Sequence, residues 1–418
     1  MLKTFLLIVV LSAQALAYDG KPIEILSVQD AIKIAFEKNP EFNRLSQEIN
    51  SKKGEWWQSF GIYDPELFYF KEGIGDTQPF SERRWGVTQN IDFPLTSYYR
   101  LRKVSFETQA MESKYNAGRY NIIAEIKTLY TNLMYALEMT NLAKKQLDIS
   151  ENLVSISEAR YEAGESSHLD LLKAEIQKAE ADNAMQKAKQ NFNIARYNLF
   201  KLIGLEPEQQ QYSIQFPDTL TYVEVDIDQA SALHKLEIQP QYITMNKMFN
   251  AADMGVKQSW SEFLPNFSLS YYQQDYDLGD GYNYYGYQIG VNVPLWFFLN
   301  QRGKIQQKKA ERNAVRWQRK ETELEIKRQI EIAWHSYDMS KKNIQRFQQI
   351  IRSRARQLWN LTSEGYRTGD ITLLALLEAQ RTYLNSERQY FEALKDYYMT
   401  IIVLEKFMQI ELLFSDSH

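Results

Sequence analysis

The distribution of apolar and polar residues along the chain predicts two kinds of regular structure. In several segments apolar residues alternate with small polar ones, which is the period of a β-strand with one apolar face. The clearest run has apolar residues at Tyr285, Tyr287, Ile289, Val291 and Val293. We expect strands over residues 65–73, 84–94, 265–274 and 284–295. The segment LFYF at 67–70 departs from the alternation because it is apolar on both faces.

These strands have the length and the flanking residues of membrane strands. Each spans about ten residues, enough for a tilted strand to cross a bilayer, and aromatic residues crowd the strand ends, as in the girdles of outer-membrane barrels. An ordinary two-layer sheet packed on helices is the alternative. Because the smallest membrane barrels have about eight strands, four strands cannot close one. The unpaired edges favour a homo-oligomer, and three copies would supply twelve strands.

A second pattern predicts very long helices. Apolar and small residues recur at alternating spacings of four and three from Ile122 to Tyr161, which is typical of left-handed coiled packing. A helix from about residue 97 to 162 would be roughly 100 Å long, with Gly118 as a weak point in its interior. The residues from Ala174 to Leu202 fit a returning helix. A solvent-exposed helical hairpin without a channel has the same periodicity, so that alternative stays open.

The two patterns occur twice, in the same order. At an offset of 200 residues Pro40 matches Pro240 and Gly86 matches Gly286. Further on, the turn RYEAGESSHLDLLKAE at 160–175 matches GYRTGDITLLALLEAQ at 365–380, an offset of 205. The repeats are far too long for a solenoid. We expect the following organisation: a signal peptide at 1–17, a first repeat at 18–205 with a helical hairpin at 97–204, a linker at 206–227, a second repeat at 228–413 with a hairpin at 299–413, and a tail at 414–418.

Composition narrows the functional classes. The first 17 residues have a positive start, an apolar centre and a small-residue cleavage site, which predicts a secretory signal peptide. Downstream there is no apolar run of 18 residues, so a membrane would be crossed by strands. The net charge of −4 does not suggest nucleic acid as a partner. There are no cysteines, and the histidines are scattered, so we expect no disulfide, metal site or cofactor. No phosphate-binding loop or nucleophile–base set indicates an enzyme.

Taken together, these features resemble the TolC-like outer membrane factors, the outer membrane efflux proteins of Gram-negative bacteria. The resemblance covers nearly all of the mature chain and rests on the duplicated layout, the strand opening LPNFSLS, the strand exits FPL and VPL, and the two turns. It implies a mainly α-helical fold with a membrane β-barrel. Each protomer of a homotrimer would contribute four strands to a 12-stranded barrel and two hairpins to a long coiled-coil helical barrel.

The resemblance also implies a function and its partners. The protein would be a passive exit duct in the cell outer membrane with a periplasmic extension. It would dock a periplasmic adaptor protein and an inner-membrane pump of RND, ABC or MFS type, in a tripartite efflux or type I secretion system. The residues alone leave two other functions open, a soluble periplasmic coiled-coil scaffold and a stand-alone diffusion porin. Neither the cargo nor the pump class follows from the sequence.

Finally, the resemblance assigns roles near the two turns. Asp170 matches an acidic residue of the first turn, and Tyr366 matches a tyrosine of the second turn that it can bond. Glu378 matches one acidic position of the pore constriction, and three copies would form a negative ring that favours cations. We expect Asp170, Tyr366 and Glu378 to form the channel gate, and Gly164 and Gly369 to mark the hairpin tips that dock the adaptor.

The sequence departs from the family pattern at two gate positions. The second acidic position of the constriction is Ala375, and the usual basic partner near the tip falls on Ile371. Arg367 and Asp370 are the nearby candidates to substitute in the gate. The departures predict a gate that is weaker or differently connected.

Overall fold

The computed structural model describes residues 25–73, 82–206, 214–228, 235–276 and 282–414. The expected signal peptide lies outside these residues. The first half of the chain contains α1 (Val28–Lys38), α2 (Pro40–Gln58), β1 (Glu66–Glu72), β2 (Glu82–Ile91), α3 (Pro94–Glu162) and α4 (His168–Ile203). The second half contains η2 (Leu236–Ile238), α6 (Pro240–Ser261), β3 (Asn266–Tyr276), β4 (Tyr282–Asn292), α7 (Phe297–Arg346), the π-helical turn η3 (Phe347–Ile351), α8 (Arg352–Thr368) and α9 (Leu373–Met408). The order repeats, which confirms the expected mainly helical fold with four strands and an internal duplication.

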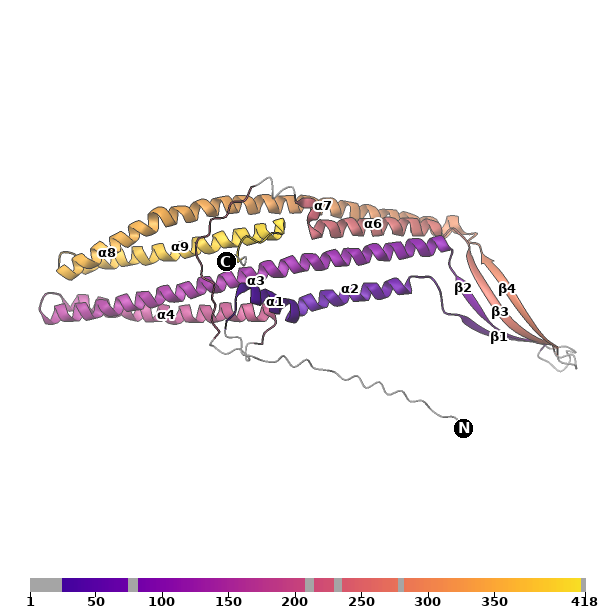
Figure 1. Ribbon diagram of the computed structural model, residues 1–418, viewed down its shortest axis with the longest axis horizontal. Helices are drawn as coiled ribbons and strands as arrows, with labels where there is room; N and C mark the ends of the chain where they lie inside the picture. The colour runs from indigo at the N-terminus through magenta and orange to yellow at the C-terminus, as the bar shows by residue number, and fades with distance from the viewer. Residues whose placement is uncertain (1–24, 74–81, 207–213, 229–234, 277–281, 415–418) are drawn as a thin grey trace, which may run out of the picture.

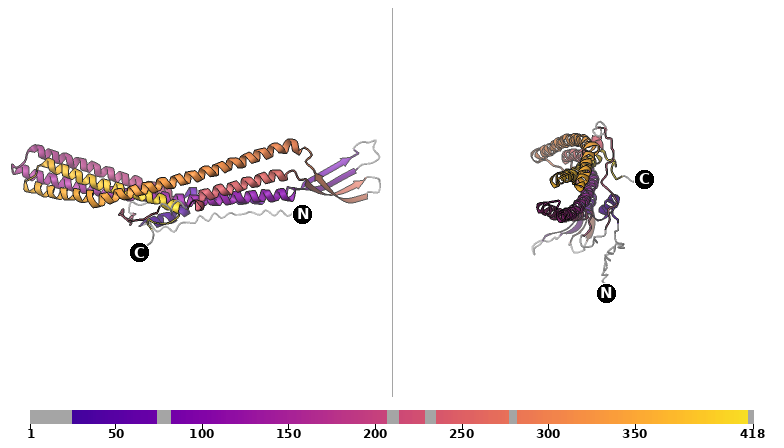
Figure 2. Two further views of the ribbon diagram at one scale, coloured as in Figure 1. Left: turned by 90° about the horizontal axis from the view of Figure 1, so that it is seen from above. Right: turned by 90° about the vertical axis from the view of Figure 1, so that its left-hand side faces the viewer.

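The molecule is a long rod with the sheet at one end and the two hairpin tips at the other (Figure 1). Seen along the rod, the helices form a curved layer rather than a closed bundle (Figure 2). None of the helices in the described part of the chain is both long enough and apolar enough to span a membrane.

The sheet is antiparallel, with strand order β1-β2-β3-β4. Its register places Leu67 opposite Val87, Val87 opposite Tyr271, and Tyr271 opposite Tyr287. Strand order therefore follows chain order, and β2 and β3, which come from different halves of the chain, are neighbours. The outer edges of β1 and β4 face no strand of the sheet.

The longest helix, α3, has 69 residues. Gly118 lies within it, although the sequence suggested a weak point there. A methyl group at Gly118 would lie 2.7 Å from Leu45 Cδ1 of α2. The glycine thus lets α2 approach α3 closely, and this packing compensates for the low helix propensity of glycine.

The heptad-like pattern of α3 corresponds to two different environments. Ala136, Ala143, Ser150 and Ser157, spaced by seven residues, are buried, whereas the intervening Thr140, Leu147 and Val154 are half-buried. On α4 the buried positions Ala174, Ala181 and Ala188 are also small and spaced by seven. Small side chains let the two helix backbones approach closely over the full length of the hairpin.

In each half of the molecule two helices are joined end to end, α4 with α2 and α9 with α6. The Asn39 side chain, at the start of α2, donates to the Leu202 carbonyl at the end of α4 with an N–O distance of 2.7 Å. In the second half Gln239 donates in the same way to the carbonyl of Phe407 at the end of α9. These amides satisfy C-terminal carbonyls that have no partner within their own helix. The stacked pairs α4–α2 and α9–α6 therefore lie alongside α3 and α7 and run in the opposite direction (Figure 1).

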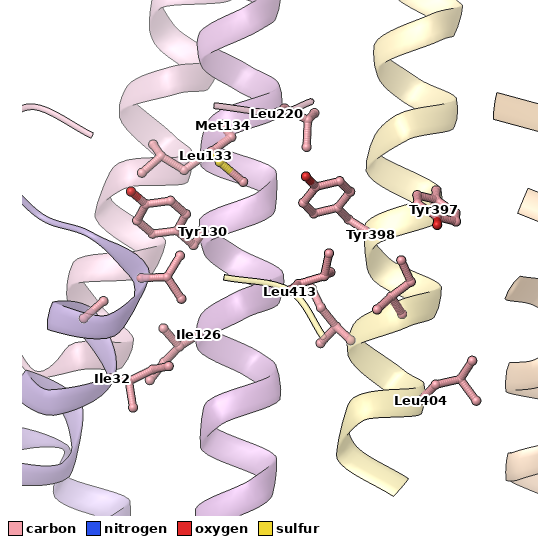
Figure 3. Packing of buried hydrophobic residues seen from close by; sticks show 14 of the residues in the cluster. Ile32, Ile126, Tyr130, Leu133, Met134, Leu220, Tyr397, Tyr398, Leu404 and Leu413 are labelled. Atoms are coloured by element: carbon pink, nitrogen blue, oxygen red, sulfur yellow. The ribbon is translucent and has the colours of Figure 1, made fainter. Parts of the chain in front are cut away.

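The main hydrophobic core lies at the waist of the rod, where the stacked helices meet. It combines α1, α3, α4, α7, α9 and the segment 214–227, and Figure 3 shows Tyr130, Leu133, Met134, Tyr398 and Leu413 packed together there. The Tyr130 hydroxyl lies 2.9 Å from the Leu26 carbonyl oxygen and 2.7 Å from the Asp218 carboxylate. The core therefore ties the N-terminal helix, the middle segment and the C-terminus to the long helix.

A buried ion pair fastens the C-terminal segment to this core. Lys127 Nζ of α3 lies 2.9 Å from Glu405 Oε2 of α9 and 3.0 Å from the Leu413 carbonyl oxygen. The other oxygen of Glu405 accepts the backbone N–H groups of Leu412 and Leu413, at 2.5 and 2.6 Å. The side chains of Lys127 and Glu405 are 2% and 5% exposed, so each charge depends on the other.

Replacing Lys127 by methionine should destabilise the protein by about 3–5 kcal/mol, because Glu405 would be left buried without its cation. The control is Lys144→Met at an exposed position of the same helix, which should change stability by less than about 0.5 kcal/mol. Thermal unfolding of the two detergent-purified variants measures the difference. Equal midpoints would contradict a structural role for the pair.

Candidate functional site

One face of the sheet is apolar and exposed. Across the register Leu67, Val87, Tyr271 and Tyr287 form one row, and Leu269 and Ile289 belong to the next. The exposed fraction is 82% for Leu67, 77% for Tyr287 and 67% for Ile289. An apolar face of four strands that covers no other part of the described chain is an interaction surface.

The opposite face is polar and contains two aromatic rings placed over glycines. Phe68 and Tyr272 belong to one row together with Gly86 and Gly286. A methyl group at Gly86 would lie 2.9 Å from Phe68 Cζ, and one at Gly286 would lie 2.5 Å from Tyr272 Cζ. Both repeats therefore use a glycine to make room for an aromatic ring of the adjacent strand. This packing accounts for Phe68, one of the two apolar residues that LFYF places on the polar face; Phe70 lies opposite Arg84 and is 45% exposed.

Exposed aromatic residues surround the junction between the sheet and the helices. Trp57 is 71% exposed at the end of α2, Trp260 is 50% exposed at the end of α6, and Trp296 is 66% exposed just before α7. Trp57 stacks on Phe60, with ring centroids 5.7 Å apart. Such residues are typical of the boundary between lipid and water, so the apolar face ends where the helices begin.

At the other end of the rod the two hairpin tips have the same backbone structure. Gly164 and Gly369 have φ angles of +75° and +88°. Each glycine follows the end of a helix, and the next residue donates its backbone N–H to a carbonyl in the last helical turn. The N–O distance is 2.8 Å from Glu165 to Arg160 and 2.9 Å from Asp370 to Gly365. This arrangement is the Schellman motif. A serine and a threonine, Ser167 and Thr372, then cap the returning helices.

The tips differ in the packing of their tyrosines. Tyr161 is 43% exposed, whereas the equivalent Tyr366 is 4% exposed. The Tyr366 ring lies under the Arg160 guanidinium at 5.1 Å, and Arg160 Nη1 donates to the Tyr366 carbonyl at 3.1 Å. The Tyr366 hydroxyl is 3.4 Å from Ser157 Oγ. Arg160 thus fastens the second tip to the first hairpin of the same chain.

The structure does not bring the residues of the expected gate together. Asp170 lies 3.8 Å from Lys173 on its own helix, and among the described residues no hydrogen bond joins it to Tyr366. Glu378 is exposed and lines a groove with Gln177 and Glu180 of α4. The bond between Asp170 and Tyr366 that the family resemblance implied is therefore absent from the single chain.

The two candidate substitutes in the gate, Arg367 and Asp370, also lie elsewhere. Arg367 pairs with Glu364 on its own helix at 3.7 Å, and Asp370 accepts a hydrogen bond from Thr368 at 2.6 Å. Sequence reasoning missed Arg160, which sits in the first turn instead. Its equivalent in the second repeat is Gly365, and this difference between the repeats was the available signal.

A buried ion pair near the middle of the second hairpin was also missed. Arg352, directly after the π-helical turn, makes two hydrogen bonds of 2.8 and 2.7 Å to Glu387 of α9. Burial alone would raise the pKa of Glu387, but the hydrogen bonds and charges of Arg352 and the charge of Arg356 outweigh it and lower that pKa below its usual value. The pair holds α8 against α9 wherever Glu387 is ionised, and its contribution is lost only as the pH falls through that lowered pKa.

The described residues contain no group of three or more histidine, cysteine, aspartate or glutamate side chains placed to hold a metal ion. What they contain is an exposed apolar sheet at one end of a long helical layer and a pair of capped tips at the other. This combination is typical of a protein that buries one end in an apolar environment and presents the other to partners, and comparison with known proteins makes the class specific.

The sequence profile of the outer membrane efflux protein family matches residues 73–205 and 245–408, well over half of the chain. The chain belongs to this family. It is 22% identical over 404 residues to the cobalt-zinc-cadmium resistance protein CzcC of Cupriavidus metallidurans, covering 92% of this chain and 90% of that protein.

Solved structures agree in fold. The CmeC outer membrane channel of Campylobacter jejuni has a TM-score of 0.79 at 16% identity, covering 91% of this chain and 85% of that chain. The outer membrane protein VceC of Vibrio cholerae has a TM-score of 0.76 at 17% identity, covering 91% and 95%. The protein is therefore an outer-membrane efflux duct of the TolC-like type and not an enzyme.

Replacing Gly164 by alanine should destabilise the first tip by about 1–2 kcal/mol, because alanine disfavours the left-handed conformation. No atom lies within 4 Å of a methyl group there, so the cost comes from the backbone alone, and asparagine should recover part of it. Hydrogen exchange of the amides at 160–170 reports the change.

The matched control for this substitution is Gly303→Ala. Gly303 lies within α7, also with no atom near a methyl group, and alanine there should instead stabilise by about 0.5–1 kcal/mol. Faster exchange in the alanine variant at 164 without recovery by asparagine would contradict this explanation.

Proposed function

We propose that three copies of this chain close into one duct, in which the sheets form a twelve-stranded barrel in the outer membrane and the helices form a tube in the periplasm. The observation that supports it most is the sheet: four strands with a mostly apolar, largely exposed face and two unpaired edges. In lipid, unpaired backbone N–H and C=O groups are too costly to leave exposed. Pairing of β1 with β4 of the next copy satisfies both edges, and closure leaves the polar face around the lumen.

The flanks of the helical layer support the same assembly. On α4 the exposed apolar residues Leu169, Leu172 and Ile176 lie along one side, and on α8 Leu358 and Leu361 are 46% and 75% exposed. These helices form the two lateral borders of the tip region in Figure 1. Contact between α4 of one copy and α8 of the next buries both sets and continues the ring of hairpins.

The tips are the part of the duct that meets its partners. We assign docking of a periplasmic adaptor to the two capped turns around Gly164 and Gly369, which have matching backbone structure and open space around the first glycine. The adaptor links the duct to an inner-membrane pump, which supplies the energy for efflux or secretion. With two similar tips in each of three copies, the proposed trimer offers the adaptor six similar positions around its periplasmic end.

The gate is assigned to the same end of the tube. Tyr366 is held by Arg160, and we propose that this contact keeps the second hairpin against the first in the closed duct. Asp170 is half-buried and Glu378 is exposed on the single chain, and we assign them contacts with the neighbouring copy and the constriction, respectively. Opening moves the second hairpin away from Arg160.

The sheet face predicts a test with neighbouring residues. Ile289→Lys places a charge on the apolar face and should cost about 2–4 kcal/mol near the middle of the bilayer, whereas Gln288→Lys places it on the polar face and should be tolerated. Heat-resistant trimers in the outer-membrane fraction are the measurement. Loss of trimer in both variants or in neither would contradict the assigned faces, and release of wild-type protein without detergent would favour a soluble scaffold.

The gate predicts a change in conductance. Arg160→Ala removes both contacts to Tyr366 and should raise single-channel conductance in planar bilayers several-fold, while Tyr366→Phe removes only the long hydroxyl contact and should change it little. Arg367→Ala, in an exposed pair, is the control. If the unmodified duct already conducts as strongly as the Arg160 variant, the protein is an open porin and the gate does not exist.

A further inference from the structure

Two cations end the apolar face of the sheet at its loop end, away from the helices. Lys71 of β1 and Arg83 of β2 are directly opposite each other in the register. Lys71 has the parity of Leu67 and Tyr69, and Arg83 has the parity of Trp85, so both lie on the apolar face. Both are exposed.

The protein itself does not neutralise this pair. Within the described part of the chain neither side chain has an ion-pair partner within 4 Å, and Oδ1 of Asp275, the residue opposite Arg83 on β3, accepts no hydrogen bond. Like charges placed directly opposite in a sheet repel each other. The two cations are therefore available to an anion from outside the chain.

The adjacent arginine shows the contrast. Arg84 points to the polar face, where its guanidinium is 2.7 Å from Glu82 and lies over the Tyr272 ring at 4.8 Å. Two consecutive arginines thus have different environments, since Arg84 has an ion-pair partner in the protein and Arg83 has none within 4 Å in the described residues. The difference follows from the face each occupies and not from the local sequence.

The depth of Lys71 and Arg83 relative to the boundary between lipid and water indicates which anion they meet. The next row toward the helices contains Tyr69, Trp85 and Tyr285, which are 66%, 55% and 68% exposed. Tyrosine and tryptophan on a lipid-facing surface mark the boundary with the headgroups. Lys71 and Arg83 lie two residues, or roughly 6.6 Å, beyond that row, and so at headgroup level on the side opposite the periplasmic helices.

We propose that Lys71 and Arg83 bind the phosphate groups of lipid A, the glycolipid of the outer leaflet. This inference rests on the proposed orientation of the duct in the outer membrane. A guanidinium binds phosphate through two parallel hydrogen bonds, and a neighbouring ammonium adds a point charge. In the closed ring each copy supplies one such pair, so that three sites lie around the outer rim.

The test uses the full-length protein purified in detergent, stripped of lipid and titrated with bisphosphorylated lipid A. The double variant K71Q/R83Q should bind roughly thirtyfold more weakly, since each cation near an anionic lipid surface contributes roughly a fivefold change. The control R84Q removes the same charge from the other face and should bind within about twofold of wild type. Native mass spectrometry counts the bound lipids and the copies of the chain together.

Two further arms identify the source of the phosphate. Inorganic phosphate at the same concentration should not displace lipid A. K71Q/R83Q should weaken binding to phosphatidylglycerol vesicles less than binding to lipid A, because each phosphatidylglycerol headgroup carries one phosphate and bisphosphorylated lipid A carries two. Displacement by inorganic phosphate, or equal loss in R84Q, overturns the lipid A site. Unchanged lipid A binding by a trimeric K71Q/R83Q also overturns it while leaving the duct intact, whereas a wild type that does not form trimers contradicts the duct.

Discussion

Backbone hydrogen bonding in the sheet is the constraint on which the rest of the structure depends. A strand in lipid must give every N–H and C=O group a partner, because no water is present to supply one. Within this chain β2 and β3 achieve this on both sides, but β1 and β4 do so only on one. One face of the sheet is also mostly apolar and largely exposed. The proposed ring follows from these two facts, since it pairs the last edges without adding any element.

The helical layer extends from the sheet to the tips as a set of closely packed helices. Small residues at every seventh position let α3 and α4 run together, and the Asn39 and Gln239 amides join the shorter helices into continuous columns. The waist core and the Lys127–Glu405 pair fix these columns to the long helices at one level. Near the tips the two hairpins are joined by a small apolar cluster around Leu153, Leu373 and Leu376 and by the contact of Arg160 with Tyr366. In the proposed duct, opening at this end would leave the waist and the sheet in place. That division suits a duct whose membrane end stays fixed while its other end responds to partners.

Much of this fold could be predicted from the sequence because its patterns are long and repeated. The alternation around Ile289 and the sevenfold spacing from Ile122 each persist over many residues, and the duplication gave every element a second, independent occurrence. Gly118 was misjudged because helix propensity is a local quantity, while the need for a glycine came from Leu45 on another helix. The site was harder to predict. Glycines 164 and 369 could be identified from their turns, but the pairing of Tyr366 with Arg160 depends on how two hairpins pack, and the Arg352–Glu387 pair joins residues 35 positions apart.

The central claim is that β1 of one copy pairs with β4 of another. The chain has no cysteine, so pairs of introduced cysteines report contacts without background. One cysteine should be placed at 67 or 69 on β1 and the other scanned over 285–291 on β4, followed by oxidation in intact outer membranes. The account predicts covalently closed trimers for the registers that bring the two strands together, because a disulfide forms only when the Cα atoms lie within about 7 Å. If every cysteine pair gave only uncross-linked monomer, although the protein was present in the membrane, the pairing of β1 with β4 would be contradicted.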